Sequence, residues 1–441
     1  MSEASSVARG AGYRGRAGDD VPARAIGRVA GVRAQLVDAE LPKARAGDGV
    51  RICARDVAVA GRIAAVHGTR AVIAPFASVE GVAHGDRIEA APDSLALPFG
   101  TPLLGRAVDA AGGALDGRGC VRGLRRAAGS APFPRTGARL ACRGTFHTGV
   151  RAIDGVLPFA RGARIGIFGA PGAGKSTLLD AIVRGADADA VVVALVGERG
   201  REAERWLRAI APSTTLICAT GDRPAGERRR AAEAAFAQAE ALCARGLDVL
   251  LVVDSLARAC AAARELALAA GEAPGRGGFP PSVFALLARL LERAGAFAAG
   301  SITLVATVLS DGPDANDPVS EAARAALDGH LVLSPALAAR GWFPAIDVPA
   351  SASRTLTDAA SAEHVRDARR VRAALAALDA ARDARSLGLD PAAGDPFLAR
   401  CIAAEDALER FLCQDERASP PAETLTRLRE LADTLDDGRL C

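Results

Sequence analysis

The sequence predicts an α/β protein in three parts: a small N-terminal β-barrel, a doubly wound α/β core and a C-terminal helical domain. Short alternating runs fill 25–92, apolar runs alternate with helical segments through 93–355, and Ala-, Leu- and Arg-rich helices occupy 356–441. The first 24 residues are rich in Gly, Ala, Ser and Arg and carry little apolar content. We therefore expect a mobile tail over 1–24.

The barrel prediction rests on period-two alternation. The runs that carry it are RAIGRVAGVRAQLVDA, VRICA, VAVAGRIAAVHGTRAVIAPF and DRIEAA, each broken by Gly, Asp or Pro. Short strands with these breaks are typical of a small barrel or sandwich. A turn-rich stretch follows at 98–119, and we expect it to cross between domains.

The core prediction rests on continuous apolar runs, which are typical of parallel strands covered on both faces. The runs are ARIGIFGA, AVVVALVG, TTLICAT, DVLLVVDS and SITLVATVLS. Helix-like segments lie between them: KSTLLDAIVRGA, REAERWLRAIA, AGERRRAAEAAFAQAEALCARG and PPSVFALLARLLERAG. This alternation predicts a doubly wound sheet. The C-terminal helices are interrupted at 388–396 and at 418–423.

Composition excludes several classes of protein. Lys+Arg 55 against Asp+Glu 52 gives a net charge of only +3, so no basic field points to nucleic acid or acidic lipid. No run of about 20 apolar residues and no signal-peptide core is present, and we expect a soluble, cytosolic protein. The nine cysteines stand singly, and we expect buried apolar residues rather than disulfides or a zinc site.

Residues 169–176 match the phosphate-binding pattern G-x-x-x-x-G-K-[ST], between a predicted strand and a predicted helix. The glycines let backbone N–H groups surround a phosphate chain at a helix N-terminus. Only Lys43 and Lys175 are lysines, and Lys175 supplies a point charge that arginine's planar fork does not replace. We expect Ser176 to ligate Mg²⁺. The predicted nucleotide-binding residues in this loop are Gly169, Ala170, Pro171, Gly172, Ala173, Gly174, Lys175, Ser176 and Thr177.

Two acidic residues end other apolar runs. Asp254 ends LDVLLVVD, where an acid beside the phosphate loop can hold a metal ion through water, although it can also cap the next helix. Glu198 follows VALVG, where a carboxylate can polarise an attacking water and Arg199 can offer a cation to a γ-phosphate. An ion pair of Glu198 with Arg199 or Arg201 on the surface is the alternative interpretation.

A series of motifs resembles one family in order and spacing. They are LLGRAVDAAGGALDGRG, GAPGAGKSTLL, VGERGRE, LLVVDS, GSIT, NDP, LDGHLVLS and FPAIDVPASASR. The pattern is similar to the export ATPases of bacterial type III secretion systems, of both injectisome and flagellar branches, which are related to rotary F-type and V-type subunits. The resemblance covers roughly 25 to 356 and implies a RecA-like P-loop core.

The resemblance also implies roles for single residues. Glu198 matches the catalytic glutamate that orients water, and Arg199 a residue near the γ-phosphate. Arg258 matches a basic residue packed behind the P-loop, and Arg354 the arginine that a neighbouring subunit inserts towards the γ-phosphate. Phe343 matches the aromatic on which adenine stacks. The implied catalytic set is Lys175, Glu198, Arg199 and Arg354, with Ser176 and Asp254 at the metal.

The implied function is an Mg²⁺-dependent ATPase that energises type III protein secretion through chaperone release and substrate unfolding. Because one chain carries both Glu198 and Arg354, a homohexameric ring is expected. The implied partners are central stalk and peripheral stator proteins and chaperone–effector complexes. The implied place is the cytoplasm, at the inner face of the bacterial inner membrane.

Several alternatives stay open at this stage. A flagellar export ATPase and a rotary F- or V-type catalytic subunit share the motifs. A ring-shaped RNA translocase is disfavoured because 25–91 holds a single aromatic residue, Phe76. Glu227 and Glu233 interrupt the arginine run at 226–234, which we interpret as a solvated helix face, with no nucleic-acid partner. A scaffold that only binds ATP would not need Lys175, Glu198 and Asp254 together.

Overall fold

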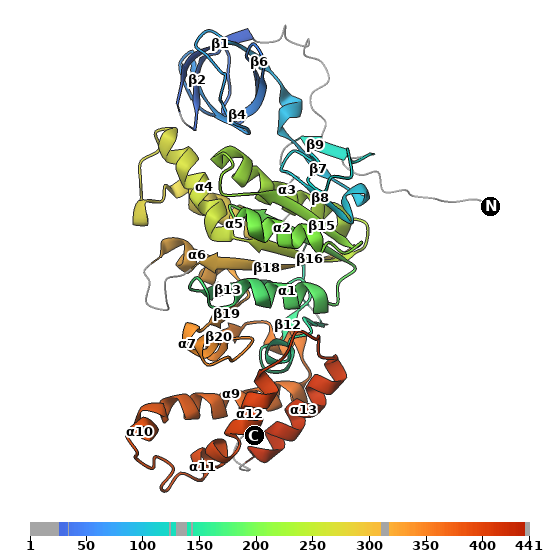
Figure 1. Ribbon diagram of the computed structural model, residues 1–441, viewed down its shortest axis with the longest axis vertical. Coiled ribbons are helices and arrows are strands. Elements are labelled where there is room, and N and C mark those ends of the chain that lie inside the picture. The colour runs from blue at the N-terminus through green and yellow to red at the C-terminus, as the bar shows by residue number, and fades with distance from the viewer. Residues whose placement is uncertain are drawn as a thin grey trace, which may run out of the picture.

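The computed structural model describes residues 26–33, 35–122, 125–128, 139–142, 144–309 and 317–436. Figure 1 shows a barrel at one end, a central sheet between helices, and a helical part at the other end. The predicted fold class is confirmed. The tail expected over 1–24 lies outside the described residues, and the domain boundaries stay predictions.

Six antiparallel strands close the barrel in the order β1-β2-β5-β4-β3-β6. They are β1 (Ile26–Val32), β2 (Val37–Glu40), β3 (Gly49–Cys53), β4 (Ala58–His67), β5 (Arg70–Pro75) and β6 (Arg87–Ala90). In β4, Val59, Gly61 and Ile63 are buried while Ala58 and Arg62 are exposed. This is the period-two burial that the alternating sequence predicts.

The central sheet runs in the order β20-β19-β13-β18-β16-β14-β15-β8. Its strands are β8 (Arg106–Val108), β13 (Arg164–Gly169), β14 (Ala190–Val196), β15 (Thr214–Ala219), β16 (Asp248–Asp254), β18 (Ser301–Leu309), β19 (Gly329–Leu333) and β20 (Ile346–Ser353). The five predicted runs form β13, β14, β15, β16 and β18, all paired in parallel. The turn-rich stretch 98–119 does more than connect domains, because β8 within it adds an edge strand beside β15. Only β20 is antiparallel along this path.

Shorter elements connect the parts. Pairs of short strands are β7 (Ala96–Phe99) with β9 (Arg125–Ala128), β11 (Thr145–Phe146) with β12 (Phe159–Ala160), and β10 (Arg139–Leu140) with β17 (Gly295–Phe297). Short 3₁₀ turns are Pro92–Leu95, Thr101–Leu103 and Arg276–Gly278, and a π-helical turn spans Ala152–Val156.

Helices cover both faces of the central sheet, as continuous apolar strands require. One face packs against α3 (Ala225–Cys243), α4 (Leu256–Ala269), α5 (Pro281–Leu291) and α6 (Pro318–Ala326). The other face packs against α1 (Lys175–Gly185) and α2 (Gly200–Arg208). The short helices α7 (Pro335–Ala339) and α8 (Leu356–Ala359) flank β20 in the chain.

The C-terminal helices are α9 (Ala362–Ala380), α10 (Arg382–Ser386), α11 (Pro396–Ala403), α12 (Glu405–Leu412) and α13 (Pro421–Thr434). Four of these five helices, all except α10, share the hydrophobic cluster of α1 and α2. Phe411 of α12 and Leu428 of α13 are buried in that cluster. None of the helices within the described ranges has the length and apolar character needed to cross a membrane.

Helix α3 differs from the solvated face expected at 226–234. Arg230 is buried, and its guanidinium donates hydrogen bonds to the carbonyl oxygens of Ser94, Ala96 and Ala110. The same guanidinium lies 4.5 Å from the ring centroid of Phe76. The expectation is wrong because this face joins the barrel and its linker to the core.

The cysteines are less uniformly buried than expected. Cys218, Cys243, Cys260 and Cys401 are buried in the core. Cys53, Cys142 and Cys413 are half-buried, and Cys120, directly after the turn-rich stretch, is exposed. The expectation is therefore wrong for these last four residues.

The contact between α3 and the barrel gives a stability prediction. A β-carbon on Gly226 would lie 2.0 Å from the carbonyl oxygen of Pro75, at the end of β5. Gly226→Ala should lower the free energy of unfolding by about 1–3 kcal/mol, because backbone must move to admit the methyl group. Thermal melting measures the loss.

The matched control is Gly200→Ala, since nothing lies within 4 Å of a β-carbon at that helical position. The control should stay within about 0.5 kcal/mol of the wild type. Equal melting temperatures for the two variants would contradict the close packing of α3 against β5.

Candidate active site

The phosphate loop connects β13 to α1 in the way the motif predicts. Gly172 and Gly174 have φ angles of 83° and 89°, which residues with a side chain rarely adopt, and Gly174 is the N-cap of α1. Lys175 Nζ donates hydrogen bonds to the carbonyl oxygens of Gly169 at 2.6 Å and Ala170 at 2.9 Å. The lysine therefore folds back over its own loop, at the helix N-terminus where anions bind.

The acidic residues lie at the same edge of the sheet. The neighbouring strands β14 and β16 are parallel and pair Leu195 with Asp254, so Glu198 follows directly beyond that edge. The Asp254 carboxylate is buried and accepts a 2.5 Å hydrogen bond from Thr307 Oγ1 on β18. This contact fixes the orientation of the carboxylate. Burial raises the pKa of Asp254.

Glu198 is buried and forms an ion pair with Arg258, whose Nε lies 3.0 Å from Glu198 Oε1. Arg258 also donates to the carbonyl oxygen of Gly197. The alternative of a surface pair between Glu198 and Arg199 or Arg201 is wrong, because the buried carboxylate faces α4 instead. Arg199 is exposed at the N-cap of α2.

The electrostatic environment sets the proton affinity of these groups. Burial, and then the negative charge of Asp254, raise the pKa of Glu198 to about 7, while Arg258 acts in the opposite direction. Burial lowers the pKa of Lys175, and the charges of Asp254 and Glu198 oppose that effect. A carboxylate with a pKa near neutrality suits a group that accepts hydrogen bonds from, or takes a proton from, water.

The donors around the loop fit a hard cation. Ser176 lies half-buried in the first turn of α1, and Asp254 is held in a fixed orientation by Thr307. No cluster of three or more His, Cys, Asp or Glu side chains that could hold a metal occurs among the described residues. Mg²⁺ takes one or two protein oxygens together with phosphate oxygens, so Ser176 and Asp254 suit it without such a cluster.

A cavity of about 610 Å³ lies beside the phosphate loop. Phe343 is 42% exposed in its wall, and a β-carbon on Gly174 would lie 3.8 Å from the Phe343 ring. The lining comes from the residues before the π-helical turn, from α1 and its N-cap, from the segment before β20 and from the segment after α12: Val150, Arg151, Gly174, Thr177, Leu178, Ala181, Arg184, Gly341, Phe343, Pro344, Cys413, Gln414, Asp415 and Glu416. An exposed aromatic ring over such a cavity can stack on a planar base.

Arg151 and Gln414 are cavity residues that sequence reasoning missed. The Arg151 guanidinium donates to the carbonyl oxygens of Phe411 and Cys413 at the end of α12. The Gln414 side chain donates to Gly149 O at 2.7 Å and accepts from the Arg151 backbone N–H at 2.8 Å. These contacts close the cavity with the C-terminal helices. No motif signals them, since the partners lie more than 250 residues apart in the sequence.

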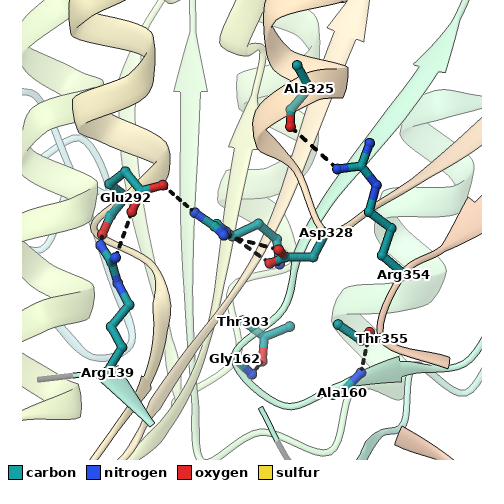
Figure 2. A network of polar contacts seen from close by, with 10 residues as sticks. Arg139, Ala160, Gly162, Glu292, Thr303, Ala325, Asp328, Arg354 and Thr355 are labelled. Carbon is teal, nitrogen blue, oxygen red and sulfur yellow. Dashed lines mark hydrogen bonds and ion pairs between the residues drawn. The ribbon is translucent and has the colours of Figure 1, made fainter. Parts of the chain in front are cut away.

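Arg354 is not part of this cluster. It is exposed just after the antiparallel strand β20. Ser353, the last residue of β20, pairs with Gly329 of β19, and Gly329 pairs with Ile165 near the start of β13. The phosphate loop begins four residues further along β13, about 13 Å away at the opposite edge of the sheet. Figure 2 shows Arg354 reaching the carbonyl oxygen of Ala325, at 3.4 Å, at the end of α6. The structure therefore brings Lys175, Glu198 and Asp254 together and leaves Arg354 apart.

Comparisons with known proteins agree with this geometry. Residues 149–353 match the model for the ATP synthase alpha/beta family, nucleotide-binding domain. Residues 360–430 match the T3SS EscN ATPase C-terminal domain.

Individual relatives cover most of the chain. A type 3 secretion system ATPase of Sinorhizobium fredii is 41% identical over 402 residues, 88% of each chain. A flagellum-specific ATP synthase of Pseudomonas aeruginosa is 40% identical over 383 residues, 85% of each chain. The assembled ATPase EscN of enteropathogenic E. coli, solved in complex with its central stalk EscO, superimposes with a TM-score of 0.84 at 36% identity. That superposition covers 92% of this chain and 100% of EscN.

The environment of Glu198 gives a pH prediction. Because only the ionised carboxylate accepts a proton, kcat/KM for ATP hydrolysis should fall as the pH drops through about 7, the pKa of Glu198. Arg258→Gln removes the cation that lowers this pKa, so the midpoint of the acid limb should move to higher pH. Rates measured from pH 5.5 to 9 locate both midpoints.

The residual rate of Glu198→Gln serves as the control and should lack this limb. An Arg258→Gln midpoint equal to that of the wild type would show that the limb does not report Glu198.

Proposed function

The chain belongs to the family of type III secretion system ATPases, and from this premise we propose that it hydrolyses MgATP in a homohexameric ring to energise protein export. The observation that carries the proposal is the meeting of Lys175, Asp254 and Glu198 at one edge of the parallel sheet. These are the groups needed to hold a nucleotide's phosphates, hold a metal ion and orient a water molecule.

In the proposed reaction, water attacks the γ-phosphate in line with the bond to ADP. Glu198 orients that water, and its pKa near 7 lets it take up the proton as the oxygen–phosphorus bond forms. Lys175 and Arg199 stabilise the negative charge on the transferred phosphoryl group. Mg²⁺, held by Ser176 and Asp254, would supply further neutralisation of the phosphate oxygens. Phe343 stacks on adenine in the cavity beside the loop.

Arg354 is proposed to act on the site of a neighbouring subunit. It lies at the amino edge of its own sheet, away from its own phosphate loop. An arginine that serves the next subunit needs a head-to-tail interface, and such interfaces close into rings. The same chain therefore supplies a phosphate loop to one interface and Arg354 to the other, which a homohexamer satisfies.

One of the proposed partners, a central stalk, is supported by a relative. EscN is described as assembled and in complex with its central stalk EscO, and we extend an equivalent stalk contact to this chain. Peripheral stator proteins and chaperone–effector complexes complete the proposed set, at the cytoplasmic face of the inner membrane. Flagellar export is the second candidate function, because a flagellum-specific relative is nearly as similar as the secretion ATPase.

Removal of either Lys175 or Glu198 tests the chemistry. Lys175→Ala and Glu198→Gln should each reduce steady-state ATP hydrolysis by about 100-fold or more, because each removes a group that acts in the transition state. Both proteins should keep their melting profile. Phosphate release at saturating MgATP measures the loss.

The other lysine provides the matched control. Lys43 lies in a turn of the barrel, and Lys43→Ala should hydrolyse ATP at the wild-type rate. A Glu198→Gln protein with full turnover would remove Glu198 from the mechanism.

Assembly gives a separate prediction. If Arg354 completes the neighbour's site, the specific activity should rise steeply with protein concentration as rings form. Arg354→Ala should abolish most of that rise. An arginine that a neighbouring subunit inserts into the site, called an arginine finger, contributes about 10³-fold or more to kcat. Mass photometry beside the activity assay relates rate to oligomer. Constant specific activity from a proven monomer would contradict the ring.

A further inference from the structure

A contact between Arg324 and Phe168 connects helix α6 to the phosphate-loop strand. The Arg324 guanidinium carbon lies 4.8 Å from the centroid of the Phe168 ring, within the range of a cation–π interaction. Phe168 is 1% exposed and directly precedes Gly169, the first residue of the phosphate loop. A displacement of the loop would therefore move the ring on which Arg324 packs.

Gly166 makes this contact possible. A β-carbon on Gly166 would lie 2.4 Å from the Phe168 ring and 2.7 Å from Leu327. The ring therefore folds back along β13 over a position without a side chain, and it faces the C-terminal end of α6. This arrangement ties the strand that carries the loop to that helix end.

The same helix end holds Arg354. The Arg354 guanidinium donates to the carbonyl oxygens of Arg324 and Ala325, each at 3.4 Å, in the last turn of α6 where unpaired carbonyls favour a cation. The Arg354 backbone N–H donates to Asp328 O at 2.8 Å. Asp328 is in turn bound to Arg164 at the start of β13. Arg164 Nε donates to the Asp328 carboxylate at 2.9 Å, and the Asp328 backbone N–H donates to Arg164 O at 2.8 Å.

We propose that Arg324 is a positioning residue. Its side chain packs on Phe168 and its backbone carbonyl oxygen accepts a hydrogen bond from Arg354. Arg324 therefore fixes the position of Arg354 relative to the phosphate-loop strand of its own chain. The inference rests on the proposed role of Arg354 in the neighbouring site. Because one residue contacts both groups, a shift of the loop at one site moves the finger offered to the next site. Arg324 thus couples adjacent sites around the ring.

Three substitutions test the proposal in the assembled full-length protein. Arg324→Leu should lower kcat about tenfold with KM for ATP within about twofold, because the finger acts on the transition state in the next subunit and not on binding in its own. Arg324→Lys can still place a cation over the ring and should keep kcat within about threefold. Arg264→Leu is the matched control. It removes an arginine of α4 that lies 5.0 Å from the ring centroid of Phe279, and it should leave kcat unchanged.

A double-mutant comparison separates positioning from general packing. If Arg324 acts through Arg354, then Arg324→Leu should not slow the Arg354→Ala protein further in single-turnover assays. Independent, multiplying losses would overturn the proposal, as would a kcat for Arg324→Leu within twofold of the wild type. An Arg354→Ala protein of wild-type rate would instead reject the proposed finger role itself.

Phe168→Leu carries the test if Arg324→Leu fails to assemble. It removes the same contact from the strand side and keeps an apolar core residue. A loss of kcat that disappears in the Arg354→Ala background supports the proposal, and a loss that persists there contradicts it.

Discussion

The direction of the strands in the central sheet determines where every proposed functional group lies. β13, β18, β16 and β14 run in parallel, so the loops that follow them meet at one edge. β20 runs antiparallel, so the residue that follows it, Arg354, lies at the other edge. The site proposed here takes groups from both ends of the strands, so on this proposal a second subunit has to complete it.

The groups at the carboxyl edge are electrostatically dependent on one another. Two buried carboxylates, Asp254 and Glu198, lie close enough for the first to raise the pKa of the second. Lys175 and Arg258 are the cations that make these charges tolerable in a buried setting. Removal of one member therefore shifts the proton affinity of the others.

Local motifs made most of the fold and the phosphate site predictable. The glycine pattern around Lys175 sits between a strand and a helix, and five apolar runs became five parallel strands. The barrel followed from period-two alternation, which burial in β4 reproduces. In these cases the physical cause lies within a few residues of the pattern.

Contacts between distant segments could not be predicted in the same way. With 53 arginines in the chain, no sequence signal distinguishes Arg151 or Arg324, and only the family resemblance singles out Arg258. What distinguishes them is their tertiary partners. Arg151 binds the end of α12, Arg258 pairs with the buried carboxylate of Glu198, and Arg324 packs on the ring of Phe168. Arg230 shows the opposite error, because a run of charges read as a solvated face is buried against the linker of the barrel.

The central claim is that each active site takes Lys175 from one subunit and Arg354 from the next, and mixed rings test it most directly. Lys175→Ala subunits keep the finger and Arg354→Ala subunits keep the phosphate loop, so each homogeneous ring should be inactive. Rings assembled from an equal mixture should recover a measurable fraction of wild-type ATP hydrolysis, because some interfaces then combine an intact loop with an intact finger. The mass of the mixed rings shows whether they contain both kinds of subunit. If such rings stay as inactive as the two homogeneous rings, the shared site is contradicted.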